Sequence, residues 1–213
     1  MNKEQLKNLK SNLPAYPGIL GKEEYFNSAV LVPLFLAEGE YHLLFEKRAA
    51  SIRQGGEICF PGGEIEETDA DCTEAAIRET EEEVGISRED IEIVGRMDTL
   101  IGPRGITVEP IVAELNISDT NSCMIDKTEV EKVFSVPIHY FEENKPKVYK
   151  VLSRINYKMF NEDGKEESLI PTDSKEKSYS ENIRKVLVYK VNGEVIWGIT
   201  ARLVYEIVKK MQK

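Results

Sequence analysis

The residues with the most evident chemical capacity are the glutamates of RETEEEVGI, residues 78–86. With about 100° per residue on a helix, Glu79, Glu82 and Glu83 share one face, whereas Glu81 points elsewhere. Carboxylates at this spacing lie about 5–6 Å apart and repel one another unless a cation lies among them. Oxygen ligands select Mg²⁺ or Mn²⁺ over Zn²⁺. The spacing therefore predicts a divalent metal site, although charge alone would favour a plain solvated face.

The segment FPGGE, residues 60–64, precedes these glutamates and supplies a turn with two adjacent glycines. Glycine backbone can approach a ligand closely and adopt φ values that other residues avoid, so we expect Gly62 and Gly63 to shape the loop that enters the helix. Farther upstream, Arg48 and Arg53 carry guanidinium groups that match phosphate geometry. They are candidate phosphate ligands, and surface salt bridges with the many acids explain them equally well.

Together these segments resemble the Nudix hydrolase family, whose box reads G-x5-E-x7-R-E-U-x-E-E-x-G-U, with U an aliphatic residue. The residues that match the second half of this box are Arg78, Glu79, Glu82, Glu83, Gly85 and Ile86. Thr80 occupies a position that is usually aliphatic. In the first half, Ala70 stands where the box has Glu, and Gly63 lies one residue farther from Arg78 than the pattern allows.

The longer spacing resembles the coenzyme A pyrophosphatase branch of this family. The segment RAASIRQGGEICFPGG, residues 48–63, is similar to the branch signature R-S-x3-R-x3-G-x3-F-P-G-G. Ala49 replaces the Ser of that signature, and the interval from Arg53 to Gly56 is one residue short. The resemblance covers roughly residues 29–208, with one long interruption.

The resemblance implies a metal-dependent hydrolase of the pyrophosphate bond of coenzyme A or acyl-coenzyme A. The products would be 4′-phosphopantetheine, or its acyl form, and adenosine 3′,5′-bisphosphate. Two alternatives stay open: a Nudix hydrolase of another nucleoside diphosphate derivative, such as ADP-ribose or a dinucleotide, and a non-catalytic nucleotide-binding protein. The complete set of box glutamates disfavours the second alternative.

The resemblance also implies roles for individual residues. The metal ligands, for Mg²⁺ or Mn²⁺, would be Glu79, Glu82 and Glu83. The general base would come from the box helix, where Glu82 is the candidate, or from a later loop, where Glu129 is the preferred one. Glu131 and Glu109 are weaker substitutes. Glu129 could equally be an acid at the start of a helix, interacting with the helix dipole.

Arg78 would orient the catalytic loop through a salt bridge, but its usual acidic partner is missing, and Asp69 or Asp71 could substitute. Phe60 and Trp197 could stack on an adenine, although aromatic residues in strands more often belong to the core.

The elements that must position these residues follow from hydrophobic periodicity and turn residues. We expect helices at 2–12, 71–84 and 200–211, strands at 27–36, 41–48, 91–100, 107–115, 185–191 and 194–199, and a short helix or turn at 127–134. The pattern indicates an α+β or mixed α/β fold, and the resemblance implies a Nudix-like α/β/α sandwich with a mixed β-sheet.

The chain of 213 residues has a net charge of −10 and a sequence pI of about 4.9. We expect one domain over residues 1–213, with a polar insertion at 156–185. An acidic chain of this kind does not favour nucleic acid or an anionic membrane, because both require a basic face. The expected partner is a small-molecule nucleotide, and a homodimer stays open.

Cysteine usage and hydropathy indicate the compartment. The three cysteines are scattered and form no CxxC pair, so neither a zinc site nor a disulfide framework is expected. The polar N-terminal segment lacks the apolar stretch of a signal peptide, and no apolar run is long enough to span a membrane. These features predict a cytoplasmic protein.

Overall fold

A mixed β-sheet built around β1 (Phe26–Ala37) organises the computed structural model, which describes all residues except 16–17, 104, 157–159, 167–178 and 213. The strand order is β3-β2-β1-β7-β5, while β4, β6 and β8 pair with β1, β7 and β2. β1 and β7 are parallel, and the other pairs are antiparallel. The remaining strands of this sheet are β2 (Glu40–Arg48), β3 (Ile58–Cys59), β4 (Gly62–Glu64), β5 (Ile91–Arg96), β6 (Leu100–Gly102), β7 (Ile106–Leu115) and β8 (Val130–Pro137).

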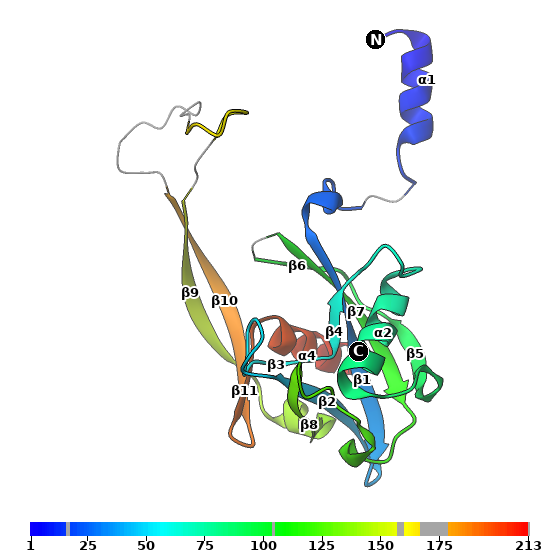
Figure 1. The fold of residues 1–213 in the computed structure, drawn as a ribbon, viewed down its shortest axis with the longest axis vertical. Helices are drawn as coiled ribbons and strands as arrows, with labels where there is room; N and C mark the ends of the chain where they lie inside the picture. The colour runs from blue at the N-terminus through cyan, green and yellow to red at the C-terminus, as the bar shows by residue number, and fades with distance from the viewer. Residues whose placement is uncertain (16–17, 104, 157–159, 167–178, 213) are drawn as a thin grey trace.

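A second, three-stranded antiparallel sheet contains β9 (Lys147–Asn156), β10 (Tyr179–Val191) and β11 (Glu194–Trp197). Its β9–β10 pair extends away from the body of the domain, whereas β11 lies beside β3 (Figure 1). The helices are α1 (Lys3–Asn12), α2 (Cys72–Val84), α3 (Ile138–Glu143) and α4 (Gly198–Met211), and the 3₁₀ turns are η1 (Lys22–Glu24), η2 (Arg88–Asp90) and η3 (Thr120–Ser122).

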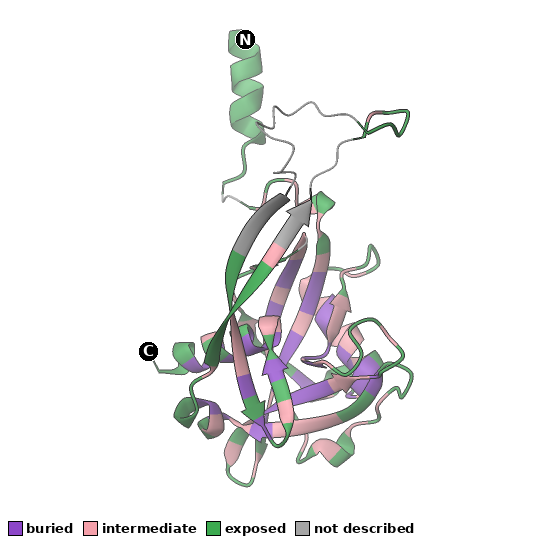
Figure 2. Cartoon of the chain, turned by 90° about the vertical axis from the view of Figure 1, so that its left-hand side faces the viewer, coloured by how far each residue is buried: buried purple, intermediate pink, exposed green. Residues whose placement is uncertain are grey.

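Alternation along β1 explains the layering, because successive side chains of a strand point to opposite faces of the sheet. Ala29, Leu31 and Phe35 belong to one buried cluster, which includes Ala75 and Ala76 of α2. Val32 belongs to a second cluster, which includes buried residues of α3 and α4. Buried clusters therefore lie on both faces of the central strands, much of whose length is buried or half-buried (Figure 2). The expected fold class, a mixed sheet between helices, is confirmed.

Several expected elements have different bounds or another type. Of the two conformations expected for the segment 127–134, a short helix or a turn, the turn is found at residues 127–129 and the helix is not found. The rest of the segment belongs to β8, because it pairs with β2. Within the polar insertion 156–185, β10 already begins at Tyr179, while residues 157–159 and 167–178 lie outside the described residues. The strand expected at 194–199 ends at Trp197, where α4 begins. The helix α3 was not expected.

The remaining expectations for the helices agree closely with the structure. α1 has Asn2 as its N-cap and contributes no buried residue. None of the described helices is both long and apolar enough to cross a membrane.

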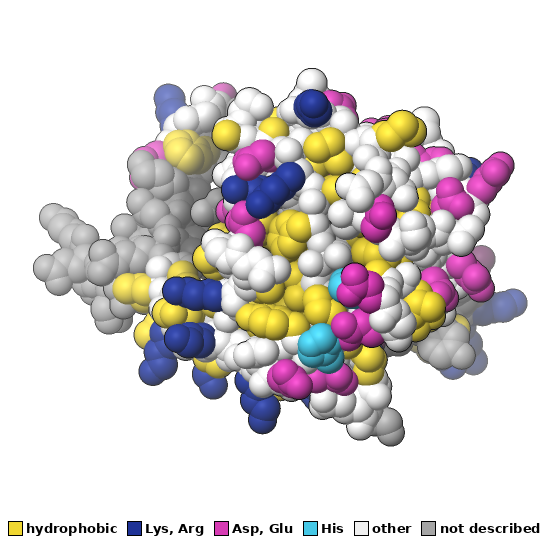
Figure 3. Space-filling view, turned by 90° about the horizontal axis from the view of Figure 1, so that it is seen from below, with side chains coloured by type: hydrophobic (Ala, Val, Ile, Leu, Met, Phe, Trp, Pro, Cys, Tyr) yellow, Lys and Arg dark blue, Asp and Glu magenta, His cyan; other side chains and the backbone are white. Residues whose placement is uncertain are grey.

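Seen from below the view of Figure 1, the surface presents Lys and Arg side chains along one side and acidic side chains along another, with hydrophobic side chains between them (Figure 3).

Candidate active site

A cleft of about 340 Å³ lies beside α2 and β4 and contains most of the candidate residues. Its lining residues are Arg48, Gly62, Gly63, Glu64, Glu66, Arg78, Glu79, Glu82, Glu83, Asp126 and Glu129. The lining thus carries seven carboxylates and two guanidinium groups. Another hollow, of about 390 Å³, is lined by residues of α4 and the segment 97–100 and contains none of the candidates.

Helix α2 places the three box glutamates along the cleft because its ends and its buried face are fixed. At its N-terminus, Asp71 Oδ1 accepts hydrogen bonds from the backbone N–H groups of Thr73 (2.7 Å) and Glu74 (3.2 Å). At its C-terminus, Gly85 adopts the left-handed conformation, with φ of 68°. The face that packs on the sheet includes Ala75 and Val84, both fully buried. The glutamates therefore project from the flank of a firmly anchored helix.

Glu83 is the most buried of the three glutamates, at 3% exposure. Its Oε2 accepts a hydrogen bond from the Gly62 backbone N–H at 2.8 Å, and its Oε1 lies 3.7 Å from Nη1 of Arg48. Burial raises the pKa of Glu83 well above the usual carboxyl range, and the negative charge of Glu46 raises it further. Burial also raises the pKa of Glu79. Around this cleft the carboxyl groups outnumber the arginines.

Gly62 and Gly63 make the close approach between β4, β1 and α2 possible. A Cβ atom at residue 63 would overlap the carboxylate of Glu79, so only glycine leaves this side chain in place. Gly62 has φ of 152°, and a Cβ there would overlap the backbone of Ala29 and Val30. Both glycines belong to β4, which pairs with β1, whereas the sequence placed them in the loop that enters α2; that loop follows them.

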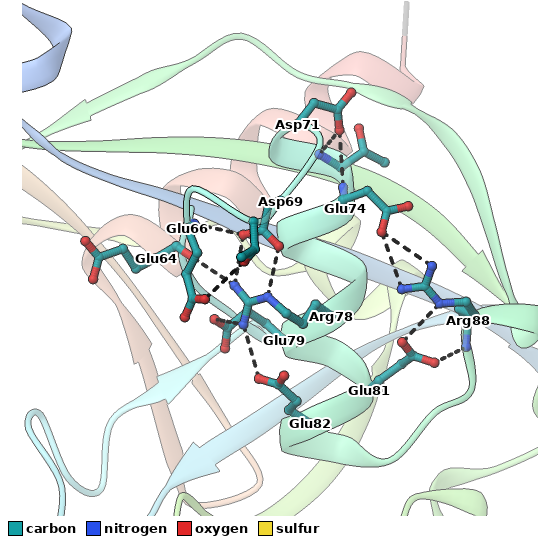
Figure 4. Close-up of polar contacts among 12 residues, drawn as sticks. Glu64, Glu66, Asp69, Asp71, Glu74, Arg78, Glu79, Glu81, Glu82 and Arg88 are labelled. Carbon is teal, nitrogen blue, oxygen red and sulfur yellow. Dashed lines mark hydrogen bonds and ion pairs between the residues drawn. The ribbon is translucent and has the colours of Figure 1, made fainter.

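Arg78 lies at the centre of the polar network shown in Figure 4. Its guanidinium donates to Asp69 from Nε (3.0 Å, Oδ1) and Nη2 (3.1 Å, Oδ2), and Nη1 donates to Glu79 (2.8 Å) and Glu82 (3.1 Å). Of the two acids considered for the salt bridge, Asp69 is therefore the partner. Asp71 instead caps α2 and pairs with Arg96.

The donor set fits a hard divalent cation in its chemistry, since all the side-chain donors of the three box glutamates are carboxylate oxygens. Within the described part of the chain, however, no three Asp, Glu, His or Cys side chains are arranged as a ready metal centre. The reason is visible in the contacts: Arg78 holds Glu79 and Glu82, whereas Glu83 turns toward Gly62. Binding a metal ion therefore requires small side-chain rotations of groups already in the cleft.

Glu129 lines the cleft from the turn that leads into β8. Its carbonyl accepts a hydrogen bond from the Ala49 N–H at 2.7 Å, which joins this turn to the end of β2. The alternative view of Glu129 as an acid at a helix start is wrong, because a strand follows it. Glu82 also lines the cleft, so both candidates for the general base are present.

The weaker substitutes for the base lie elsewhere. Glu131 is paired with Lys47 at 3.3 Å, and Glu109 is paired with Lys22 at 2.6 Å and accepts from Thr99 at 2.8 Å. Neither is among the residues that line this cleft.

Of the candidate substrate-binding arginines and aromatic residues, only Arg48 is among the residues that line the cleft. Arg48 lines the cleft, whereas Arg53 is exposed on the adjoining loop and accepts a hydrogen bond from Arg48 Nε through its carbonyl (3.3 Å). Phe60 is a core residue, 2% exposed and stacked on Phe45, so it does not stack on a nucleotide. Trp197, at the end of β11, is 42% exposed.

Sequence reasoning missed two acids close to the box glutamates. Asp126 lines the cleft and accepts from Thr128 N–H at 2.8 Å, a local turn contact that the DKT triplet could have indicated. Glu46 is fully buried beside Arg48 and Cys59. The sequence did contain a signal for Glu46, because an acid directly follows the apolar residues LLF of an expected strand. A charged side chain buried in a strand needs a specific partner.

The family model that matches the chain is the NUDIX domain, over residues 25–154. The chain belongs to the Nudix family. The match includes β1, the Nudix helix α2, and the turn that carries Glu129.

Similar proteins are found among curated sequences and solved structures. The peroxisomal coenzyme A diphosphatase NUDT7 of Mus musculus is 37% identical over 122 residues, covering 57% of this chain and 50% of the relative. The mitochondrial coenzyme A diphosphatase NUDT8 of Homo sapiens is 31% identical over 125 residues, covering 58% and 53%. A solved binary complex of a C. elegans Ap4A hydrolase is 24% identical, with a TM-score of 0.46, covering 55% of this chain and 84% of that one. The chain spans about half the length of the two coenzyme A diphosphatases.

Proposed function

We propose that this Nudix protein hydrolyses the pyrophosphate bond of coenzyme A or acyl-coenzyme A in a metal-dependent reaction. The products are 4′-phosphopantetheine, or its acyl form, and adenosine 3′,5′-bisphosphate. The observation that carries the proposal is that the box glutamates, Glu129 and Arg48 all line one cleft. The similarity to proteins named coenzyme A diphosphatases supports the choice of substrate.

The metal ion would be Mg²⁺ or Mn²⁺, held by Glu79, Glu82 and Glu83. When bound, such an ion polarises a phosphoryl oxygen and lowers the pKa of a coordinated water. The Gly62 N–H holds Glu83 through Oε2 and leaves Oε1 for the cation, and Glu79 lies against Gly63. The excess of carboxylates over arginines around the cleft favours a cation there over an additional anion.

The general base would be Glu129, with Glu82 as the alternative. Glu129 reaches the cleft from the turn before β8, a different element from the three metal ligands. It can therefore accept a proton from the attacking water while the helix glutamates hold the cation. Arg78 would position Glu79 and Glu82 through its pairing with Asp69.

The substrate phosphates would meet Arg48 within the cleft and the exposed cation of Arg53 on the adjoining loop. Gly62 and Gly63 line this part of the cleft, and because they carry no side chains a diphosphate can approach their backbone closely. Arg48 Nη1 lies 3.7 Å from Glu83 and 3.9 Å from Glu46, too far for a full hydrogen bond, so its Nη donors can bind a phosphate while Nε donates to the Arg53 carbonyl.

We further propose that residues 1–213 form one domain. The core supports this, because buried residues of α4, as far as Val208, cluster with Val32 of β1. A cytoplasmic location and a homodimer stay predictions, which cell fractionation and light scattering would test.

The test is product identification by mass spectrometry across coenzyme A, acetyl-coenzyme A, ADP-ribose and a dinucleoside polyphosphate, with Mg²⁺ or Mn²⁺. We expect the two named products from coenzyme A, and a loss of ~10²-fold or more in kcat for Glu83→Gln, the range typical of lost electrostatic stabilisation. Turnover of ADP-ribose or the dinucleotide alone would instead favour the alternative substrate class. Binding without turnover of any of them would favour a non-catalytic protein.

A further inference from the structure

Glu46 is the most unusual acid in the described structure. It lies in the middle of β2, and its side chain is fully buried. Its Oε1 accepts a hydrogen bond from the Cys59 thiol at 3.1 Å. Its Oε2 is the buried side-chain oxygen that has no hydrogen-bond partner among the described residues. A buried carboxylate with an unpaired oxygen is costly, so its retention calls for an explanation beyond packing.

The surroundings of Glu46 indicate what it does. Nη1 of Arg48 lies 3.9 Å from Glu46 Oε1 and 3.7 Å from Glu83 Oε1, so one guanidinium nitrogen is close to both buried carboxylates. Glu46 does not line the cleft, whereas Arg48 and Glu83 do. Glu46 therefore lies outside the cleft, next to an arginine that lines it.

The charges show what would change without it. With both acids present, Arg48 is shared and neither contact reaches hydrogen-bond distance. Without the charge of Glu46, Arg48 would be free to form a full ion pair with Glu83. That pair would neutralise the carboxylate and compete with any cation for its oxygens.

We propose that Glu46 is a positioning residue that holds Arg48 away from Glu83 and so keeps the Glu83 carboxylate available to the metal ion. The inference rests on the proposed function, in which Glu83 is a metal ligand. Groups behind a metal ligand commonly change metal affinity by about 10–100-fold when they are altered.

The experiment measures Mn²⁺ dissociation constants of the full chain without nucleotide, from the electron paramagnetic resonance signal of free Mn²⁺. Glu46→Gln should weaken binding by about 10–100-fold. The matched control is Glu92→Gln, which makes the same charge change at an exposed position on β5 and should leave binding unchanged. Arg48→Gln alone should bind at least as tightly as the native chain.

The double variant Glu46→Gln/Arg48→Gln decides the route. If Glu46 acts through Arg48, Glu46→Gln has no further effect once the arginine is removed, so the double variant should bind Mn²⁺ as tightly as Arg48→Gln alone and the two changes are not additive. A double variant that is weaker than Arg48→Gln by the same factor by which Glu46→Gln is weaker than the native chain would overturn the inference, and so would a Glu46→Gln variant that binds as tightly as the native chain.

A second substitution separates positioning from folding. Glu46→Met keeps a similar side-chain length and removes the buried charge, a change that is often neutral or stabilising. We expect an unchanged or higher thermal unfolding midpoint for the metal-free variant, together with weaker Mn²⁺ binding. A lower midpoint with native Mn²⁺ affinity would assign Glu46 a purely structural role. A native chain that binds no Mn²⁺ would overturn the proposed function as well, whereas native binding that Glu46→Gln leaves unchanged overturns this inference alone.

Discussion

Arg78 and Asp69 form a two-point ion pair, with Nε 3.0 Å from Oδ1 and Nη2 3.1 Å from Oδ2. The pair joins the Nudix helix to the loop before it, and it lowers the pKa of Asp69 because the guanidinium donates hydrogen bonds to the carboxylate. The third nitrogen of Arg78 contacts Glu79 and Glu82. Asp69 thereby fixes the arginine that in turn positions two of the proposed metal ligands.

Asp69→Asn should weaken Mn²⁺ binding about 10-fold or more, because Arg78 then pairs more fully with Glu79 and Glu82. The control is Asp71→Asn, two residues away, since Asn caps a helix about as well as Asp. Titration calorimetry on both variants checks this. Equal metal affinities for the two variants would show that the Arg78–Asp69 pair has no part in the metal site.

Gly63→Ala should lower both Mn²⁺ affinity and kcat, about 10-fold or more, because its Cβ would overlap the carboxylate of Glu79 and displace it. Gly95→Ala is the matched change, since a Cβ at that position meets no atom within 4 Å. Steady-state kinetics and metal titration on both variants provide the measurement. A Gly63→Ala variant with native kinetics would contradict the proposed position of Glu79 in the site.

Glu129→Gln should lower kcat by ~10²–10⁴-fold and remove the acidic limb of the pH–rate profile, while Mn²⁺ affinity stays nearly native. Glu131→Gln, a change on β8 at a residue paired with Lys47, should leave the profile intact. Weakened metal binding in Glu129→Gln would make Glu129 a ligand. An unchanged rate would move the base to Glu82.

Metal binding should strengthen with rising pH. Burial and the nearby charge of Glu46 raise the pKa of Glu83, so the metal-free carboxyl holds its proton above the usual carboxyl range. A cation must displace that proton, and the Mn²⁺ dissociation constant should fall as the pH rises from the usual carboxyl range toward the raised pKa of about 9.

The same raised pKa has the opposite effect on the metal-free fold. The protonated carboxyl contributes stability at low pH that is lost as pH rises through the raised pKa, so the metal-free unfolding midpoint should decline over that range. Calorimetry with and without Mn²⁺ measures both the pH dependence of the metal affinity and the pH dependence of the unfolding midpoint. A metal affinity that does not vary with pH, or that varies equally in Glu83→Gln, would contradict this assignment.

The sequence predicted α2 well because local residues define it: Asp71 caps one end, and Gly85 ends the other. The position of Glu129 could not be predicted in the same way. It depends on the pairing of β2 with β8, which brings Arg48 opposite Val130 and the Ala49 N–H to the Glu129 carbonyl. Pairing between strands distant in sequence leaves no local pattern.

The same limit explains why the sequence did not predict the strand that begins within the segment 127–134. Its alternation of acids and lysines suits a helix as well as an exposed turn, and its conformation is decided by its neighbour β2. From the sequence, two acids, Asp69 and Asp71, were candidates for the ion pair with Arg78. The structure decides between them, since the carboxylate of Asp71 already accepts hydrogen bonds at the N-terminus of the helix.

Coenzyme A hydrolysis in this cleft is tested by comparing kcat/KM for coenzyme A and dephospho-coenzyme A, with the products identified. A charge-assisted contact of Arg48 or Arg53 with the 3′-phosphate should favour coenzyme A by roughly 10–100-fold, with Arg48→Ala or Arg53→Ala erasing the preference. Cleavage of both substrates with equal efficiency, or cleavage of neither, would contradict the claim.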